Sequence, residues 1–405
     1  MRRPLARVLL AALLAVAALA RLGPAQADRG GGRREGSLGG VAYSLARPPD
    51  WNGTLVMWAH GYGSNRPQPP LASHLEGHGY AWAGSLFRSI DYRPDWFIED
   101  TLALRELFIR EVGAPRRTII YGQSMGGHIA IASLELHPEI YHGALIECGN
   151  VTGIGEADFL YAYRAAADYF SGLGLLDIED KTTFWRAVNE RWLPAMGTPG
   201  RYTVKGRRFD SVVKYLTGGE LPLRLQGLEP RYLKNLGVTP SHAASRMPME
   251  RAGSTLHVRY RIDRGLGVDE AELNAKIRRR APIAGARSRD ADPVFADFTG
   301  RIRVPVLTLH ETGDGWVPFS LEQDLRRKTL AAGTAHLLVQ RAHRWPGHCA
   351  FDQEVREQAF DDLVRWMDTG VRPDGDDVLA ADRSTLGLRW TPTLHVDDPA
   401  RRRTR

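Results

Sequence analysis

The sequence predicts an α/β protein whose mostly parallel sheet has helices on both faces and whose chain carries a large helical cap insertion. Three observations support this prediction. Within residues 40–150, short apolar runs of the strand type alternate with stretches of helical periodicity. The alternation stops after Asn150 and resumes at Val304. The chain has 405 residues, of which 43% are hydrophobic, so it can bury a sizeable core around such a sheet.

The first part of the predicted core, residues 40–150, contains four buried strands and two helices. We expect the strands at 53–59, 80–85, 118–121 and 143–146, and the helices at 95–112 and 125–136. Strands that alternate with helices in this way form parallel sheets, because each helix crosses over a face of the sheet.

The second part of the core, residues 304–369, continues the same pattern. Strands are expected at 304–309 and 336–340, and helices at 321–331 and 352–367. The stretch between the two parts, residues 151–303, has helical signals interrupted by glycine and proline. We interpret it as a cap inserted into the core, and not as an independent domain, because the sheet pattern resumes after it. Residues 370–405 are polar, contain three prolines and are expected to form a surface tail.

The N-terminal residues 1–27 predict a signal peptide. Basic residues up to Arg7 precede a 13-residue apolar run, and Ala25 and Ala27 supply the small residues of a cleavage site. A membrane span needs about 20 apolar residues, so no stable membrane anchor is expected and the protein is expected to be secreted or periplasmic. Residues 28–39 are rich in glycine and arginine and are predicted to be a flexible leader.

The formal net charge of +7 is concentrated at the two ends of the chain. Four arginines lie in the first 27 residues with no acidic residue beside them, and four more lie in the last five residues. The part between them is therefore close to neutral. It has no basic stripe of the kind that binds nucleic acids, so no nucleic-acid partner is expected.

The pentapeptide of residues 122–126 fits the pattern G-x-S-x-G, with Ser124 at its centre. In this pattern, a sharp turn between a strand and a helix exposes the serine hydroxyl. The predicted strand and helix on either side supply that context. Glycine is needed at Gly122 and Gly126 because a Cβ atom there would collide with neighbouring backbone. Ser124 is therefore a candidate nucleophile.

A loop with two glycines, His60-Gly61-Tyr62-Gly63, follows the first predicted strand. Attack of a serine on a carbonyl carbon creates an oxyanion, which needs two preorganised N–H donors. The residue after the nucleophile and an upstream loop supply such donors. We assign them to the backbone of Met125 and Tyr62. The alternative is that this loop is only a turn that ends the strand.

These two motifs and the strand pattern together resemble the α/β-hydrolases over residues 40–150 and 304–367. The resemblance implies a nucleophilic serine, an acid and a histidine in that chain order. It also implies a serine hydrolase without a metal or an organic cofactor.

The resemblance implies Asp314 as the acid and His348 as the base. Asp314 lies in the loop after the strand expected at 304–309, whereas Glu311 is closer to that strand and is expected to support the turn. His348 lies in the loop after the last expected strand. His343 is the alternative base, because it lies nearer to the end of that strand.

Cys148 and Cys349 are the only cysteines of the chain. Around His348 and Cys349 the chain partly resembles tannase- and feruloyl-esterase-like hydrolases, in which the cysteine beside the histidine pairs with one directly before the serine. Gln123 occupies that position here, so a bridge would have to use Cys148. A Cys148–Cys349 disulfide, which an oxidising compartment favours, and two buried free thiols are both open alternatives at this point.

The resemblance implies that the protein cleaves carboxylic esters through Ser124, His348 and Asp314, by way of an acyl-enzyme intermediate. The expected partner is a small-molecule or polymeric ester. Two alternatives are open: an amidase or peptidase that uses the same three residues, and a catalytically inactive binding protein that retains the fold.

Overall fold

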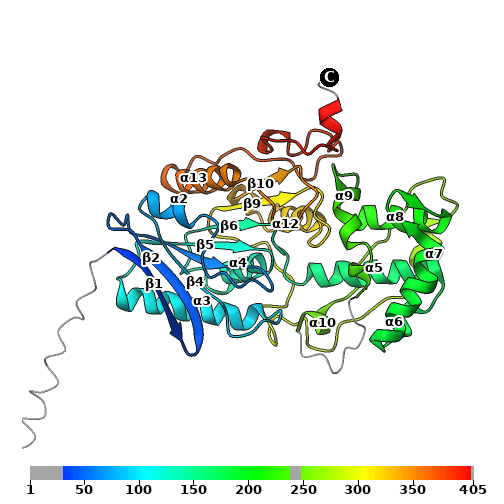
Figure 1. Cartoon of the computed structure of the whole chain (residues 1–405), viewed down its shortest axis with the longest axis horizontal. Helices are drawn as coiled ribbons and strands as arrows, with labels where there is room; N and C mark the ends of the chain where they lie inside the picture. Colours follow the sequence, from blue (N-terminus) through cyan, green and yellow to red (C-terminus); the bar gives the residue numbers. More distant parts are fainter. Residues whose placement is uncertain (1–30, 238–247, 403–405) are drawn as a thin grey trace, which may run out of the picture.

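The computed structural model describes residues 31–237 and 248–402. Its centre is an eight-stranded sheet with the order β1-β2-β4-β3-β5-β6-β9-β10 (Figure 1). The strands are β1 (Gly32–Leu38), β2 (Val41–Arg47), β3 (Thr54–Ala59), β4 (Ala81–Ser85), β5 (Arg117–Gln123), β6 (Gly143–Glu147), β9 (Val306–Glu311) and β10 (Leu338–His343). All neighbours from β4 to β10 in this order are parallel, whereas β2 is antiparallel to β1 and β4. The predicted mostly parallel sheet is confirmed. The predicted signal peptide, residues 1–27, lies outside the described residues.

Helices cover both faces of the sheet, as predicted. On one face pack α3 (Pro94–Glu111), α4 (Met125–Leu136) and α12 (Ser320–Ala331), and on the other pack α2 (Ala72–Gly77) and α13 (Gln353–Thr369). Consecutive residues of β3 point to opposite faces: Met57 packs in the cluster with α3 and α4, and Trp58 in the cluster with α2 and α13. Because both faces are buried, the central strands β3, β4 and β6 consist mainly of apolar residues on both faces and do not alternate. No helix in the described ranges combines the length and apolarity needed to cross a bilayer.

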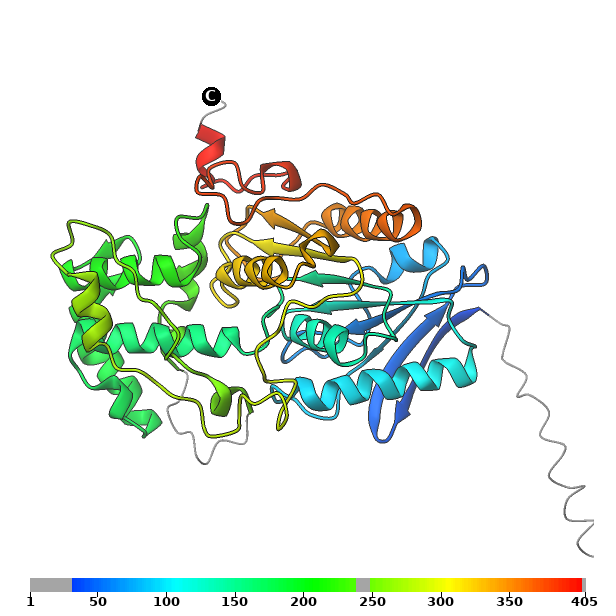
Figure 2. The same ribbon diagram turned by 180° about the vertical axis from the view of Figure 1, so that it is seen from behind.

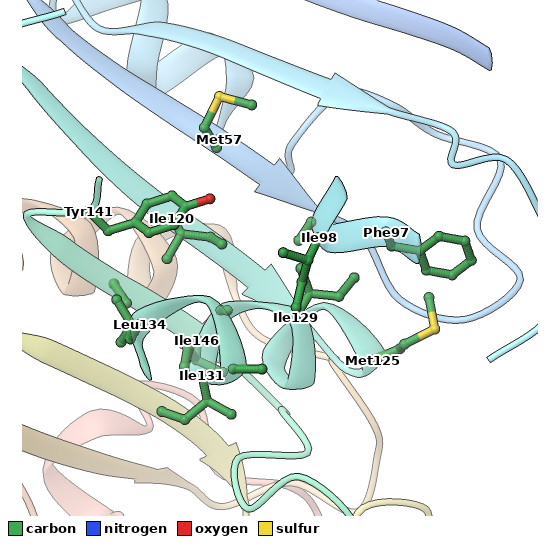
Figure 3. Close-up of a cluster of buried hydrophobic side chains, with 14 of the residues drawn as sticks. Met57, Phe97, Ile98, Ile120, Met125, Ile129, Ile131, Leu134, Tyr141 and Ile146 are labelled. Carbon is green, nitrogen blue, oxygen red and sulfur yellow. The ribbon is translucent and has the colours of Figure 1, made fainter. Parts of the chain in front are cut away.

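The packing between the sheet and α4 fixes the turn that contains Ser124. Figure 3 shows Met57 and Ile120 of the sheet in one cluster with Ile129 of α4. All three side chains are fully buried, and burial of each such side chain contributes about 1.5–3 kcal/mol. Since α4 begins directly after Ser124, this packing holds one side of the turn and β5 holds the other.

The N-terminal hairpin corrects the prediction that residues 28–39 form a flexible leader. Gly32–Leu38 forms β1, which pairs with β2 from Gly32↔Arg47 to Leu38↔Val41. Gly39 and Gly40 close the hairpin with positive φ angles of 60° and 86°. An edge strand is held by backbone hydrogen bonds, so its glycines and exposed arginines do not prevent it from forming. The glycine pair is a turn signal that the composition of the segment conceals.

The residues between β6 and β9 form a helical part, described over 151–237 and 248–303, which we call the cap. Its helices are α5 (Gly155–Ser171), α6 (Lys181–Ala187), α7 (Leu193–Met196), α8 (Val204–Leu216), α9 (Arg224–Leu228), α10 (Pro248–Ala252) and α11 (Glu270–Lys276). Two short strands, β7 (Gly197–Thr198) and β8 (Arg201–Tyr202), pair only with each other, and no described cap residue joins the main sheet. The cap has a hydrophobic cluster of its own around Trp192 and Phe209. Figure 1 shows its helices beyond the end of the sheet toward which the arrowheads of β5 and β6 point.

The chain after α13 runs back along β10, the edge strand of the sheet (Figure 2). Asp376 accepts a hydrogen bond from the Ala342 N–H at 2.8 Å and donates its own N–H to the Gln340 carbonyl at 2.7 Å. Arg344 and Asp398 form an ion pair at 2.6 Å, and both side chains are almost completely buried. The tail therefore covers the edge that β10 would otherwise expose. Its polar composition gives no sign of this buried attachment.

Candidate active site

Ser124 lies in the turn between β5 and α4, where the sequence places it. Its φ of 56° is a value that a residue with a side chain rarely adopts. Its N–H donates to the Glu147 carbonyl at 3.0 Å, and its carbonyl accepts from the N–H groups of Gly127 at 2.8 Å and Asn150 at 3.2 Å. Strained backbone that is fixed by its surroundings in this way is common at functional sites.

The glycines around Ser124 leave no room for side chains. A Cβ atom on Gly122 would lie 2.2 Å from the Gly126 carbonyl oxygen, and one on Gly126 would lie 1.8 Å from the Ala59 carbonyl oxygen. The predicted collisions are therefore confirmed. A Cβ atom on Gly61 would lie 3.1 Å from the Ser124 Cβ, so the loop after β3 lies directly against the serine.

His348 lies between Ser124 and Asp314. Its Nε2 atom is 2.8 Å from the Ser124 Oγ, and its Nδ1 atom is 2.6 Å from the Asp314 Oδ2. Asp314 follows β9 and His348 follows β10, so the three side chains meet at the carboxyl ends of parallel strands. In this geometry the serine hydroxyl donates to a neutral imidazole, whose Nδ1–H donates to the carboxylate.

The carboxylates near His348 hold two loops in place. The buried Asp314 accepts the N–H groups of Trp316 at 2.8 Å and Val317 at 3.1 Å through its Oδ1 atom. Glu311 accepts the Ala350 N–H at 2.5 Å. Glu311 therefore supports the loop of His348, in addition to ending β9.

His343, the alternative base, is not joined to Ser124. It is the last residue of β10, its ring is buried, and its Nδ1–H donates to the Trp390 carbonyl at 3.1 Å. Burial lowers its pKa below the usual value. The structure brings His348, and not His343, to the serine.

The two predicted oxyanion donors flank Ser124. Met125 is the first residue of α4, where a backbone N–H has no acceptor within the helix. Tyr62 follows Gly61, which lies against the serine, and its side chain is 55% exposed. Within the described part of the chain, neither N–H has a partner in the hydrogen-bond network.

The sheet and the turn decide the fold. A serine with positive φ follows the central parallel strand β5, and an acid and a histidine follow the later strands β9 and β10. Among the strands of the described residues, the only antiparallel pairs of the main sheet are those made by β2 of the N-terminal hairpin. The chain has the α/β-hydrolase fold.

Solved structures that resemble this chain include esterases and a peptidase-related protein. An esterase/lipase from an uncultured bacterium is 14% identical, with a TM-score of 0.41 and coverage of 91% of this chain and 95% of that one. An esterase from Pyrococcus furiosus is 14% identical, with a TM-score of 0.43 and coverage of 85% and 94%. A proline iminopeptidase-related protein from Thermus thermophilus is 17% identical, with a TM-score of 0.41 and coverage of 84% and 98%. No family model and no curated protein matches the sequence.

A disulfide joins Cys148, which directly follows β6, to Cys349, which directly follows His348. Of the two alternatives that the sequence leaves open, the structure contains the bridge. It ties the loop of the histidine of this α/β-hydrolase fold to the strand beside the serine. With His348, the two cysteines are the one cluster of three side chains with metal-ligating atoms among the described residues. Because the two sulfurs bond to each other, neither is available as a thiolate ligand.

The charges around His348 raise its pKa. Burial acts to lower the pKa, but the charge and hydrogen bond of Asp314, together with the charges of Glu311 and Glu156, outweigh burial, and the net shift is upward. The negative groups therefore stabilise the imidazolium form. His348 therefore keeps its proton to a higher pH than a free histidine does.

Glu156 is a site residue that sequence reasoning missed. It lies in the first turn of α5, the helix with which the cap begins, and its charge acts on both His348 and Asp314. Burial raises its pKa to about 7, the positive charge of His348 lowers it, and the negative charge of Asp314 raises it. No local motif marks it, because its role depends on where the cap folds back over the core.

His310 and Glu322 form a second buried group behind Asp314 that sequence reasoning also missed. The His310 Nε2 atom is 3.7 Å from the Asp314 Oδ2, and its Nδ1 atom is 3.5 Å from the Glu322 Oε1. Burial acts to lower the pKa of His310, but the nearby carboxylate of Glu322, together with those of Asp314 and Glu311, raises it to about 9. His310 therefore lies between two carboxylates, and its Nε2–H donates to the Val317 carbonyl at 2.9 Å.

The cap reaches the histidine ring through Trp316. The Trp316 ring stacks on the His348 ring, with 6.0 Å between centroids. On Trp316 lies the guanidinium of the cap residue Arg231, 3.1 Å from the ring centroid. The cap thus contributes Glu156 and Arg231, which carry opposite charges, to the surroundings of the site.

Proposed function

We propose that this protein is a secreted serine hydrolase that cleaves carboxylic esters. One observation carries the proposal: the hydrogen bonds of 2.8 Å and 2.6 Å that link Ser124, His348 and Asp314. Secretion is part of the proposal and rests on the sequence of residues 1–27 alone.

The first step is attack of Ser124 on the ester carbonyl. A serine hydroxyl is a weak nucleophile because it keeps its proton at neutral pH. The Nε2 atom of His348 therefore takes this proton as the Oγ–carbon bond forms. The hydrogen bond to Asp314 keeps the proton of the neutral ring on Nδ1 and stabilises the imidazolium that results.

The oxyanion formed in this step is stabilised by backbone donors. We assign this role to the N–H groups of Met125, which directly follows Ser124, and of Tyr62, which follows Gly61 in the loop against the serine. Loss of one such donor lowers kcat by about 10²- to 10³-fold in comparable sites.

The acyl-enzyme then forms and breaks down. His348 gives its proton to the departing alkoxide, and the acyl group stays on Ser124. The same imidazole next takes a proton from a water molecule, which attacks the acyl carbon and releases the acid. The scheme uses the side chains and backbone of this chain with water and needs no metal or organic cofactor.

Two aromatic rings offer a surface for the substrate beside the serine. Tyr62 and Trp316 expose 55% and 40% of their surfaces, whereas most large hydrophobic side chains of the described structure are buried. Tyr62 carries one proposed oxyanion donor, and Trp316 stacks on His348. Apolar acyl or alcohol groups would lose contact with water against these rings.

The experiment compares wild-type protein with Ser124→Ala on a chain-length series of p-nitrophenyl esters and on an aminoacyl anilide. We expect ester hydrolysis by the wild type, and a loss in kcat on the order of 10⁶ in Ser124→Ala with nearly unchanged melting temperature. Ser37→Ala, an exposed serine in β1, is the matched control and should keep full activity. A folded Ser124→Ala protein with wild-type activity would reject the assignment, and faster hydrolysis of the anilide would favour an amidase.

A further inference from the structure

A cavity of about 840 Å³ lies where the cap, the core and the tail meet. It is lined by α5 and α8 of the cap, by α12 of the core and by the tail residues Ala381 and Arg383. We call it the junction pocket. The lining of this pocket does not include Ser124, His348 or Asp314. Its volume is within the range of pockets that hold small molecules.

The lining of the junction pocket is predominantly cationic. It contains seven lysine and arginine side chains but only four carboxylates. This excess is not visible in the total charge, because the part of the chain between its basic ends is close to neutral. The positive charge is therefore concentrated in this pocket by the fold.

Two of these cations have carboxylate partners within the lining. Arg287 pairs with Asp158 and Asp297, each at 2.7 Å, and Arg327 pairs with Asp324 at 2.6 Å. These pairs use three of the four carboxylates that line the pocket.

Two further cations pair with carboxylates that do not line the pocket. Lys214 pairs with Asp263 at 2.6 Å and also lies 3.8 Å from Glu220, the fourth carboxylate of the lining. Arg259 pairs with Glu270 at 3.0 Å. Four of the seven cations are therefore compensated by neighbouring carboxylates.

Three cations of the pocket have no such partner among the described residues: Arg261, Lys328 and Arg383. Arg261 lies over the Tyr215 ring at 4.4 Å, a contact that leaves its N–H groups free to bind an anion. The Arg383 guanidinium lies against Gly219, where a Cβ atom would be 3.0 Å from its Nη1 atom. Arg261 is exposed and Arg383 is half-buried, and neither forms an ion pair with a carboxylate of the described residues.

Arg383 is the most constrained of the three. Its Nε atom is buried and has no hydrogen-bond partner in the described structure. Burial lowers its pKa, the positive charges of Arg327 and Arg261 lower it further, and the negative charge of Asp377 acts in the opposite direction. A buried, unpaired donor beside like charges is unfavourable unless a ligand supplies the missing acceptor.

We propose that the junction pocket binds a small multivalent anion that carries phosphate or carboxylate groups, with Arg261 and Arg383 as its principal ligands. The guanidinium fork matches both kinds of group, because each offers two oxygens to parallel N–H donors. Lys328 adds positive charge at the same pocket. The proposal is independent of the esterase assignment.

The test is isothermal titration of the purified protein with inorganic pyrophosphate and, separately, with citrate, at fixed ionic strength in a chloride buffer. Pyrophosphate and citrate separate the two ligand chemistries, because the class that belongs to the site should bind more tightly. We expect saturable binding of at least one of them, with an affinity that falls as chloride is raised.

Arg383→Gln and Arg261→Gln locate the site. Each should weaken binding by about tenfold or more, because each removes a charge-assisted pair of hydrogen bonds. Arg110→Gln, an exposed arginine of α3, should bind like the wild type, and so should Ser124→Ala. Two results would overturn the proposal: no saturable binding of either anion to the wild type, or undiminished binding to a folded Arg383→Gln or Arg261→Gln protein.

Discussion

Ser124 keeps a backbone conformation that costs about 1–3 kcal/mol, and the residues around it hold it in that conformation. Gly122 and Gly126 lie too close to neighbouring carbonyl oxygens to carry side chains. Backbone hydrogen bonds between Ser124 and Glu147, Gly127 and Asn150 hold the turn in place. The hydroxyl therefore reaches His348 without any rearrangement of the backbone.

Glu156 should contribute to the lower pH limit of activity. Only neutral His348 can take the serine proton, so activity falls as pH decreases through the pKa of His348, which lies above its usual value. Glu156 is one of the charges that raise this pKa. Because Glu156 contributes less than Asp314 and Glu311 do and has a pKa of about 7 itself, Glu156→Gln should lower the pKa of His348 slightly. The acidic limb of the kcat/KM profile should then move to slightly lower pH.

The control for this prediction is Glu139→Gln. Glu139 is an exposed carboxylate that is not among the charges that act on His348. Its pH profile should coincide with that of the wild type. A Glu156→Gln limb that stays in place or moves to higher pH would contradict the electrostatic account.

The residues of the site differ in how far sequence alone could predict them. Ser124 stands in a pattern that its own neighbours define, and Asp314 and His348 are implied by the resemblance to the α/β-hydrolases together with the expected strands. Glu156 and His310 have no such pattern, because they matter only through groups brought close by the fold. A single sequence contains no distances, so these two residues could not be found from it.

At the scale of elements, the disulfide fastens the loop of His348 to the end of β6. It joins residues that are 201 positions apart. A bridge that closes so long a loop restricts the unfolded chain strongly, and its removal from a protein typically costs about 2–5 kcal/mol. It also holds Cys349, the residue next to the proposed base, in place.

The double variant Cys148→Ser/Cys349→Ser should have a free energy of unfolding that is lower by about 2–5 kcal/mol. Its kcat should also be lower, because the loop of His348 is no longer bonded to the end of β6. Urea unfolding and ester hydrolysis measure the two effects. Reductant should reproduce them in the wild type and leave the variant unchanged. A wild type whose stability and activity are both insensitive to complete reduction would contradict this account of the bridge.

The strands that the sequence predicts and the strand β1, which it does not predict, are stabilised by different interactions. The buried strands β3, β5, β6 and β9 consist mainly of apolar residues, so their runs are visible. β1 is an exposed edge strand held by backbone bonds, and its composition predicts a leader instead.

The sequence predicts the last strand at 336–340, but β10 occupies Leu338–His343. Its second half is polar and buried, because Arg341 pairs with Asp362 and Gln340 donates to Glu322. Such polar burial depends on partners in other elements, which hydrophobicity in the strand itself does not reveal.

At the scale of the whole molecule, the tail is attached to the core by the buried Arg344–Asp398 pair. Removal of one partner leaves the other charge buried without compensation, which typically costs about 3–5 kcal/mol. Asp398→Asn should lower the free energy of unfolding by roughly this amount, measured by urea denaturation. Asp397→Asn changes the exposed neighbouring carboxylate and should have little effect. Equal stability of the two variants would show that the tail does not support the core in this way.

The cap has a hydrophobic cluster of its own, although Ala157 and Tyr161 of α5 also pack in the core cluster, and both parts contribute to the surroundings of His348. The core supplies Ser124, Asp314 and His348, while the cap supplies Glu156 and Arg231. Substrate preference should therefore change with the cap, and the bond-breaking step should depend on the core.

The account rests on Ser124 being a nucleophile that His348 activates, and covalent labelling tests this most directly. The native protein is treated with a fluorophosphonate, and the modified peptide is identified by mass spectrometry. We predict one equivalent of label on Ser124, with little or no label in His348→Ala or in urea-unfolded protein. Absence of label from a folded protein, or its attachment to a residue other than Ser124, would contradict the account.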